Sequence, residues 1–172
     1  MEKEEYAIVA DYLPNGYPLE GKIMPIIQAI GLKHFSLLQI VPRNGVDIQL
    51  SEKVYIGDGK RDKIYYILGK LPKEKLTETS KQQILKFVEE HFANNPQKII
   101  EFFNNAGAIN TRLHQLELLP GFGKKHTQEF LKERDKKPFE TIEEMKERIP
   151  SIPDPKKAVE KRLYGELVEE QR

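Results

Sequence analysis

A short stretch between two helical patterns carries the residues best suited to chemistry, and the chemistry that they suit is anion binding. Residues 119–125 read LPGFGKK. Gly121 permits the positive φ of a tight turn, which a Cβ would disfavour. Gly123 lets an anion approach the first free amides of the next helix, where the helix dipole is positive. Lys124 and Lys125 would oppose that dipole by about a few tenths of a kcal/mol, so we interpret the pair as partners for a phosphate.

The alternative is a corner made only for packing, with both lysines as ordinary solvated charge. Phe122 fits either interpretation, because it would anchor the turn between the two helices. Leucines recur at helical spacing upstream of the turn, and apolar residues follow on the helix that begins near Gly123. Arg112 and His114 precede the turn, and we expect them to support it or to flank a bound phosphate.

The order of a helix, an apolar-Pro-Gly-apolar-Gly turn and a second helix resembles the helix-hairpin-helix motif of DNA repair, recombination and replication proteins. Residues 137–145 are similar to the connector that leads into a second hairpin, with Thr141 and Glu144 as a capping box. Residues 150–155 occupy the place of that second hairpin but lack both glycines. Asp154 would cap the last helix where a phosphate would otherwise sit, so we interpret this hairpin as degenerate and structural.

The first part of the chain has the pattern of short β-strands separated by turn residues. The strand candidates are residues 6–10, 24–30, 35–41, 53–56 and 64–71. Five short strands at this spacing favour a small barrel over alternating strands and helices. The apolar run at residues 26–30 is also short enough to be helical.

Helical patterns occupy the rest of the chain. One runs from Thr79 or Ser80 to about Asn94, and Pro96 fits the first turn of the next. Four more short helices are expected over residues 110–172. The fold class is therefore predicted as α+β, with a small β-barrel at residues 1–76 and a helical domain at residues 77–172.

A barrel offers a second surface, where aromatic rings stack on bases and cations meet the backbone. We select Tyr55 as the aromatic candidate, with Lys60, Arg61 and Lys63 on a glycine-flanked loop. Further aromatic candidates in the same region are Tyr12, Tyr17, Tyr65 and Tyr66. The alternative is that these tyrosines pack half-buried in strands and that the basic loop is a solvated turn.

Composition and charge exclude several classes of protein. The chain has no Cys, so a disulfide framework, a zinc–cysteine site and a cysteine nucleophile are excluded. No metal-ligand spacing, P-loop or acid–base pair of carboxylates stands out, so we expect no metal, no cofactor and no catalysis. Net charge is +1, but residues 111–138 hold 7 basic and 4 acidic residues, a local +3 that favours a phosphate-binding surface there.

The chain shows no signal-peptide pattern and no apolar run near the roughly 18 to 20 residues that span a bilayer. We therefore expect no membrane association and a cytoplasmic location. The sequence sets no oligomeric state.

Longer stretches resemble an archaeal family of uncharacterised proteins. The likeness is carried by residues 52–57, 61–64 and 111–121, which read EKVYIG, RDKI and TRLHQLELLPG, and it extends over nearly the full length. The resemblance implies an OB-like barrel followed by tandem helix-hairpin-helix motifs, and nucleic-acid binding without an established activity. The family's genes tend to lie among those for ribosomal proteins, RNA polymerase and rRNA methyltransferases, which implies RNA and a ribosomal or translation context.

The leading expectation is a non-catalytic protein that grips the phosphate backbone of structured RNA. A DNA-binding protein of recombination or repair is the main alternative, because a barrel followed by tandem hairpins also builds the junction-binding subunit of bacterial branch-migration machinery. A glycosylase is a third candidate, against which no catalytic Lys or Asp stands at a recognisable place after the hairpin. A protein-interaction module is the fourth.

Overall fold

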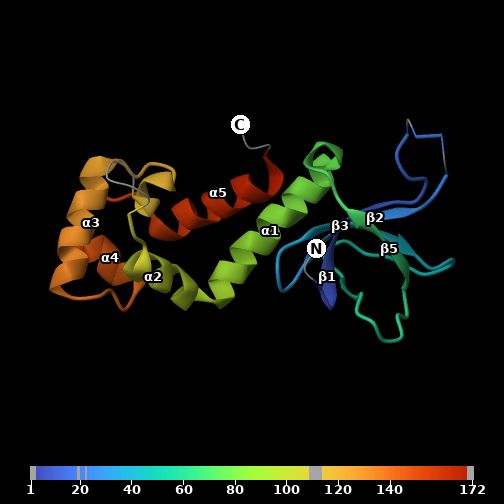
Figure 1. The fold of residues 1–172 in the computed structure, drawn as a ribbon, viewed down its shortest axis with the longest axis horizontal. Coiled ribbons are helices and arrows are strands. Elements are labelled where there is room, and N and C mark those ends of the chain that lie inside the picture. Colours follow the sequence, from blue (N-terminus) through green and yellow to red (C-terminus); the bar gives the residue numbers. More distant parts are fainter. Residues whose placement is uncertain (1–2, 19, 22, 109–113, 170–172) are drawn as a thin grey trace. The chain divides into compact units, whose positions relative to one another are not determined.

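The computed structural model describes residues 3–18, 20–21, 23–108 and 114–169, and its first part is one antiparallel sheet (Figure 1). The strands are β1 (Tyr6–Leu13), β2 (Ile26–Gly31), β3 (Leu37–Pro42), β4 (Lys53–Tyr55) and β5 (Ile64–Lys70). They lie in the order β4-β1-β2-β3-β5, and each neighbouring pair is antiparallel. All five strand predictions are confirmed, and residues 26–30 are strand rather than helix.

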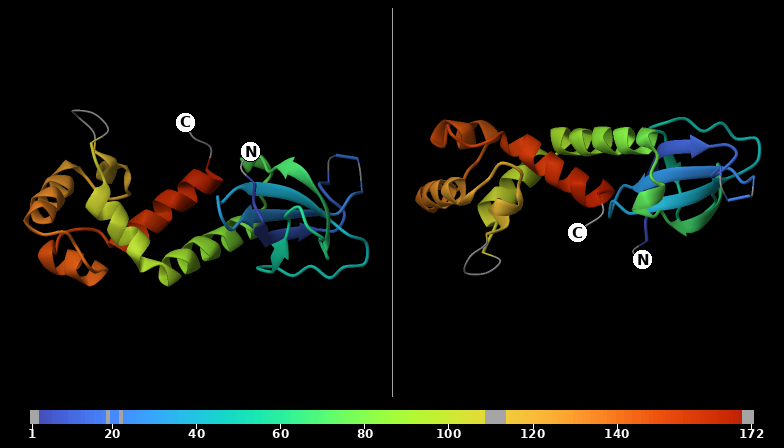
Figure 2. Two further views of the ribbon diagram at one scale, coloured as in Figure 1. Left: turned by 60° about the horizontal axis from the view of Figure 1, so that its bottom comes forward. Right: turned by 90° about the horizontal axis from the view of Figure 1, so that it is seen from above.

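The sheet curls into a half-barrel, which Figure 2 shows from two further directions. β2 and β3 are buried along their whole length, so both faces of these two strands are covered, whereas an antiparallel sheet often has one face in water. A bulge in β1 between Val9 and Asp11 adds local bending. β4 and β5 are the two edges, and within the described ranges they do not pair with each other. The largest side chains of the apolar core are Ile27, Leu38, Ile40, Ile48, Ile56 and Ile64.

A buried polar network joins the sheet to the start of helix α1 (Glu78–Asn94). Gln28 in β2 is fully buried, and its Nε2 donates to the carbonyl of Lys75 at 2.7 Å. Its Oε1 accepts from the hydroxyl of Ser80 and, at 3.2 Å, from the N–H of Thr77. The hydroxyl of Thr77 accepts the N–H of Ser80 at 3.0 Å. An unsatisfied buried amide costs about 1–3 kcal/mol, so this network fixes where the helix begins against the sheet.

The chain forms two compact units whose boundary falls inside α1. One is Met1–Lys86 with Leu167–Arg172, and the other is Phe87–Glu166. The pattern of strands and helices in the sequence had indicated a boundary at residue 76. The first turns of α1 belong to the sheet unit because Thr77 and Ser80 bond to Gln28. In the ranges that the structure covers, no helix combines the length and apolar character that crossing a membrane requires.

Short helices build the second unit, and together with the sheet they confirm the α+β class. They are α2 (Pro96–Asn105), α3 (Lys124–Lys136), α4 (Ile142–Arg148) and α5 (Pro155–Val168). The helix expected ahead of the turn at residues 119–125 is instead a short 3-10 helix, η2 (Gln115–Leu118), and residues 109–113 lie outside the described residues. His114, directly before η2, has an extended backbone and forms a bridge with Ala108.

Four phenylalanines form the core of the second unit. The ring of Phe103 lies 5.8 Å from Phe122 and 4.9 Å from Phe130, and Phe130 lies 4.6 Å from Phe139. Phe103, Phe130 and Phe139 are at most 2% exposed. Arg134 closes the end of α2 by donating to the carbonyls of Phe103 at 3.0 Å and Ala106 at 2.8 Å. The turn at residues 119–125 is therefore anchored in the core through Phe122.

Candidate functional site

The turn at residues 119–125 has the backbone that its glycine predicts. Gly121 has φ +84°, in the left-handed region that other residues disfavour. The N–H of Phe122 donates to the carbonyl of Leu119 at 3.1 Å, which closes the turn. Phe122 is 4% exposed and points into the phenylalanine core. A Cβ on Gly121 would lie 3.0 Å from Cγ of Pro153, so the second hairpin packs against the first at this glycine.

The amino end of α3 combines free amides with open space. Gly123 is the N-cap residue and offers no side chain to accept the amides of the first turn. Within the described residues, no carbonyl or side chain accepts the N–H groups of Lys124, Lys125 or His126. The Lys124 and Lys125 side chains are exposed and have no ion-pair partner there. These amides and cations are available together to an anion from solvent.

Gly123 differs from Gly121 because a side chain there would meet neither backbone strain nor a close contact. Its φ is −94°, which any residue can adopt, and a Cβ built there meets nothing within 4 Å. Neither backbone strain nor packing therefore explains a glycine at this position. The glycine leaves the first amides of α3 without a side-chain acceptor at the N-cap, as the phosphate interpretation of the sequence requires.

His114 is a structural residue of the turn. It is 9% exposed, and its Nδ1 accepts the N–H of Leu116 at 3.1 Å. Its own N–H donates to Oε2 of Glu117 at 2.8 Å, so the two side chains cap η2 reciprocally. Burial lowers the pKa of His114, and the Arg134 cation lowers it further, against a smaller opposing effect of Glu117. Of the two predicted roles, support of the turn is the one seen for His114; Arg112 lies outside the described residues.

The second hairpin has the cap that the first one lacks. Asp154 Oδ1 accepts the N–H groups of Lys156 at 3.0 Å and Lys157 at 3.3 Å, and Pro155 is the first residue of α5. Asp154 Oδ2 also pairs with Lys146 Nζ at 3.2 Å. Partial burial raises the pKa of Asp154, but the N–H of Lys157, the Lys146 ammonium and the N–H of Lys156 together outweigh it and hold that pKa below its usual range. The predicted cap is confirmed, and it occupies the amides with a carboxylate.

The predicted capping box before α4 is half formed. Thr141 Oγ1 accepts the N–H of Glu144 at 3.0 Å, as expected. Glu144 does not return to the N–H of Thr141 but accepts that of Glu140, also at 3.0 Å. The helix is capped all the same, with the carboxylate bound one residue earlier in the chain.

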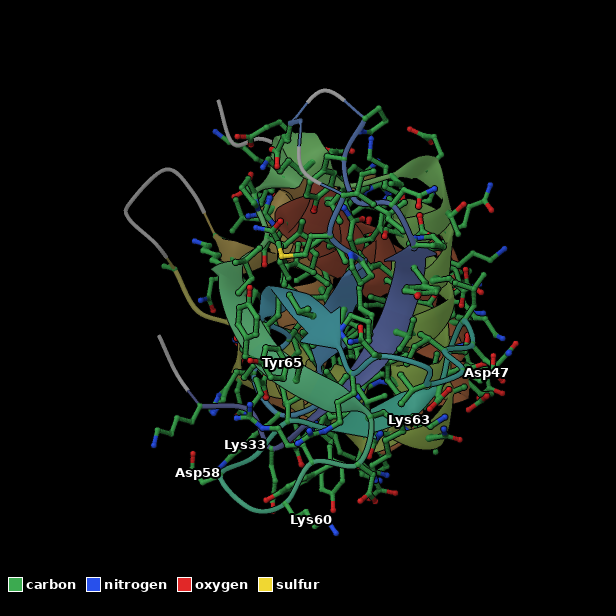
Figure 3. The ribbon with its side chains drawn as sticks, turned by 90° about the vertical axis from the view of Figure 1, so that its right-hand side faces the viewer. Lys33, Asp47, Asp58, Lys60, Lys63 and Tyr65 are labelled. Atoms are coloured by element: carbon green, nitrogen blue, oxygen red, sulfur yellow. The ribbon has the colours of Figure 1, made fainter. Side chains whose placement is uncertain are left out.

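The residues of the basic loop that the sequence predicted as nucleic-acid contacts differ in the bonds that they make within the sheet unit. Lys60 lies exposed at the loop tip (Figure 3). Lys63 Nζ is paired with Glu52 Oε2 at 2.7 Å, and Arg61 Nε donates to the carbonyl of Gly57 at 2.8 Å. The hydroxyl of Tyr55 accepts the N–H of Gly59 at 2.9 Å, and its ring lies 5.3 Å from that of Tyr6. Tyr55 therefore supports the loop through its hydroxyl group.

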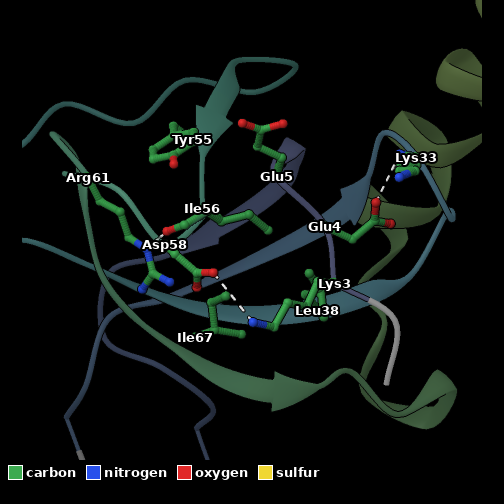
Figure 4. A pocket seen from close by; sticks show the side chains of 11 residues that line it. Lys3, Glu4, Glu5, Lys33, Leu38, Tyr55, Ile56, Asp58, Arg61 and Ile67 are labelled. Atoms are coloured by element: carbon green, nitrogen blue, oxygen red, sulfur yellow. Dashed lines mark hydrogen bonds and ion pairs between the residues drawn. The ribbon is translucent and has the colours of Figure 1, made fainter.

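A hollow of about 480 Å³ lies beside Arg61 on the sheet unit (Figure 4). Its apolar floor includes Leu38, Ile56 and Ile67, and an ion pair of 3.4 Å between Lys3 and Asp58 crosses its rim. Another hollow, of about 730 Å³, adjoins Tyr65 and Tyr66. Neither hollow is predictable from the sequence, because each is lined by segments far apart in the chain.

Comparison with known proteins assigns the chain to a family. A family model described as "Protein of unknown function (DUF655)" matches residues 3–172. The uncharacterized protein MJ0038 of Methanocaldococcus jannaschii is 41% identical over 169 residues, which is 98% of this chain and 76% of that protein. The crystal structure of Af1531 from Archaeoglobus fulgidus matches with a TM-score of 0.81 at 36% identity, over 98% of this chain and 96% of that one. These matches confirm the resemblance to an archaeal family, and the chain belongs to the DUF655 family.

Proposed function

We propose that this protein binds nucleic acid, with the turn at residues 119–125 and the start of α3 gripping a backbone phosphate as a helix-hairpin-helix motif does. The observation that supports this proposal most directly is the set of free amides at Lys124, Lys125 and His126. They lie next to Gly123, which has free space in place of a side chain. A phosphate there accepts backbone N–H groups at the positive end of the helix dipole. The two lysines then neutralise charge instead of opposing the dipole.

The second hairpin, residues 150–155, has a structural role in this proposal. Asp154 already satisfies two amides of α5, and its charge disfavours a phosphate at the same place. Pro153 instead braces Gly121 of the first hairpin. The tandem arrangement thus consists of one phosphate-binding hairpin and one packing hairpin.

The favoured ligand is structured RNA in a ribosomal or translation context, and the protein acts as a binder rather than a catalyst. Phosphate contacts position a ligand without reading its sequence, so the preference for RNA over DNA rests on the family resemblance described above. The curled five-stranded antiparallel sheet supports an OB-like unit as a second contact surface. Lys60, exposed at the loop tip, is its best-placed cation.

The test replaces both lysines of the first hairpin with glutamate. Lys124→Glu/Lys125→Glu should weaken binding to duplex RNA and duplex DNA alike, and flatten the dependence of log K on log salt by up to about 0.9 per lost contact. Stability should hardly change, because both side chains are exposed. Binding is measured by fluorescence anisotropy across a salt series, with duplexes of equal length.

The chain offers a matched control in Lys157 and Lys161, two exposed lysines of α5. Lys157→Glu/Lys161→Glu makes the same change in charge on a helix whose amino end is capped by Asp154, and it should weaken binding much less. Equal losses in the two double variants would reduce the effect to net charge. Wild-type affinity in a folded Lys124→Glu/Lys125→Glu protein would refute the proposal outright.

A further inference from the structure

The tyrosines of the sheet unit differ sharply in what their rings touch. Tyr12 packs against the apolar core. Tyr17 donates its hydroxyl proton to Oε1 of Gln39 at 2.8 Å, and Tyr55 supports the basic loop. Tyr65 is 63% exposed and Tyr66 is 36% exposed. Tyr6 in β1 is 38% exposed, but Lys53 Nζ lies 4.3 Å from the centre of its ring. The most exposed tyrosine of the described residues is therefore Tyr65 in β5.

Tyr65 and Tyr66 adjoin the hollow of about 730 Å³, a size typical of small-molecule sites, which span roughly 300–1,000 Å³. The walls come from three segments: the approach to β2, the end of β3 and the start of β5. They include Met24, Val41, Arg43, Asn44, Tyr65 and Tyr66. Tyr65 extends from β5 at the surface of the sheet unit (Figure 3). The space is open, partly apolar and bordered by aromatic rings.

The rings are held in place without being covered. Tyr66 donates its hydroxyl proton to Sδ of Met24 at 3.5 Å, a weak hydrogen bond that links two walls of the hollow. The rings of Tyr65 and Tyr66 meet edge to face, with centroids 5.2 Å apart. Tyr65 is oriented by this contact while most of its side chain stays in solvent, so it offers a stacking surface at a low cost in conformational entropy.

Arg43 supplies a positioned cation at the same hollow. Its N–H donates to the carbonyl of Lys63 at 2.8 Å, and its Nε donates to the carbonyl of Arg61 at 2.9 Å. In the described part of the chain, nothing accepts from its two terminal nitrogens. Arg43 is the one charged residue among the described residues that line the hollow. An aromatic ligand that carries a negative charge fits this lining.

We propose that the hollow between Tyr65 and Arg43 binds one unpaired nucleobase, which stacks on Tyr65 while the adjoining phosphate contacts the Arg43 guanidinium. Asn44 also lines the hollow and supplies an amide for the polar edge of the base. This inference rests on the proposed nucleic-acid-binding function but concerns a separate site. It makes the sheet unit a reader of single-stranded nucleotides, whereas the α3 hairpin contacts phosphate only.

The test compares a short oligouridylate with an abasic oligomer of the same length and backbone. Wild-type protein should bind the oligouridylate about tenfold more tightly, as expected for one stacked base. Tyr65→Leu should abolish that ratio, and Tyr65→Phe should preserve it, because the ring alone is required. Arg43→Gln should weaken binding to both oligomers, because it removes a phosphate contact. Tyr6→Leu, at a 38%-exposed tyrosine outside the hollow, is the matched control and should keep the ratio.

The outcomes separate this inference from the proposed function. An undiminished ratio in folded Tyr65→Leu protein would overturn the base site, and so would equal binding of the two oligomers by the wild type. In either case the hairpin proposal stands if Lys124→Glu/Lys125→Glu still weakens binding to duplex RNA. A protein that binds neither oligomer nor duplex overturns both.

Discussion

Replacing Asp154 with alanine tests the proposal that the turn at residues 150–155 is structural while the turn at residues 119–125 binds the ligand. The change removes the acceptor of two amides at the start of α5 and the ion pair with Lys146. Loss of a cap costs about 1 kcal/mol, and a partly exposed ion pair adds a few tenths more, roughly. For a unit of about 80 residues such as Phe87–Glu166, a loss of about 1 kcal/mol lowers the melting temperature by about 4–8 °C.

The assay for Asp154→Ala pairs thermal unfolding, followed by far-ultraviolet circular dichroism, with titration of the same protein by duplex RNA. Stability should fall as calculated, while affinity should stay unchanged or rise slightly, because a repulsive carboxylate is gone. Asp154→Asn is the control: it keeps an acceptor for the cap and loses only the charge, so most of the stability should remain. A folded Asp154→Ala protein with greatly weakened RNA binding would show that this hairpin contacts ligand directly.

The lowered pKa of Asp154 also predicts how the stability difference between the wild type and Asp154→Asn depends on pH. A carboxyl whose pKa is lower in the folded state stabilises the fold above its unfolded pKa of about 3.9. That contribution is lost as pH falls through the lower, folded value. The stability difference between wild type and Asp154→Asn should therefore be largest above about pH 4 and shrink in more acidic solution. A difference that grows on acidification would contradict the assigned contacts.

Two further predictions concern the first hairpin. Gly121→Ala should destabilise the second unit by about 1–2 kcal/mol, because Gly121 has a positive φ and its added methyl group would press against Pro153. Gly123→Ala should lower stability by less than about 1 kcal/mol. It should nevertheless weaken RNA binding by placing a methyl group before the amides. Urea unfolding and RNA titration of both variants test this contrast, and wild-type binding by Gly123→Ala would show that the open approach is unused. His114 has a lowered pKa and caps η2 as a neutral acceptor, so its stabilising effect is complete above the ordinary histidine pKa of about 6.5 and is lost as pH falls below it. His114→Asn should remove that acid-side loss, and an unchanged pH profile in this variant would assign the titration elsewhere.

Local chemistry in the sequence determined the elements and their ends. The five strands, the break before Pro96, the positive φ of Gly121 and the Asp154 cap were predicted because each depends on a few neighbouring residues. Steric limits on φ, the geometry of capping and the period of apolar residues act over one or two turns of chain. The family resemblance was likewise carried by short stretches of sequence.

Tertiary structure alone decided the strand order, the burial of His114 and the exposure of particular tyrosines. Tyr55 and Tyr65 both lie in strand patterns, but the loop at Gly59 engages one and the edge position of β5 exposes the other. The segment before the turn at residues 119–125 is a short 3-10 helix preceded by a bridge between His114 and Ala108, a contact that apolar spacing does not encode. Burial and strand pairing join residues that are distant in the chain. Their outcome therefore depends on the packing of all the elements together, which no local pattern records.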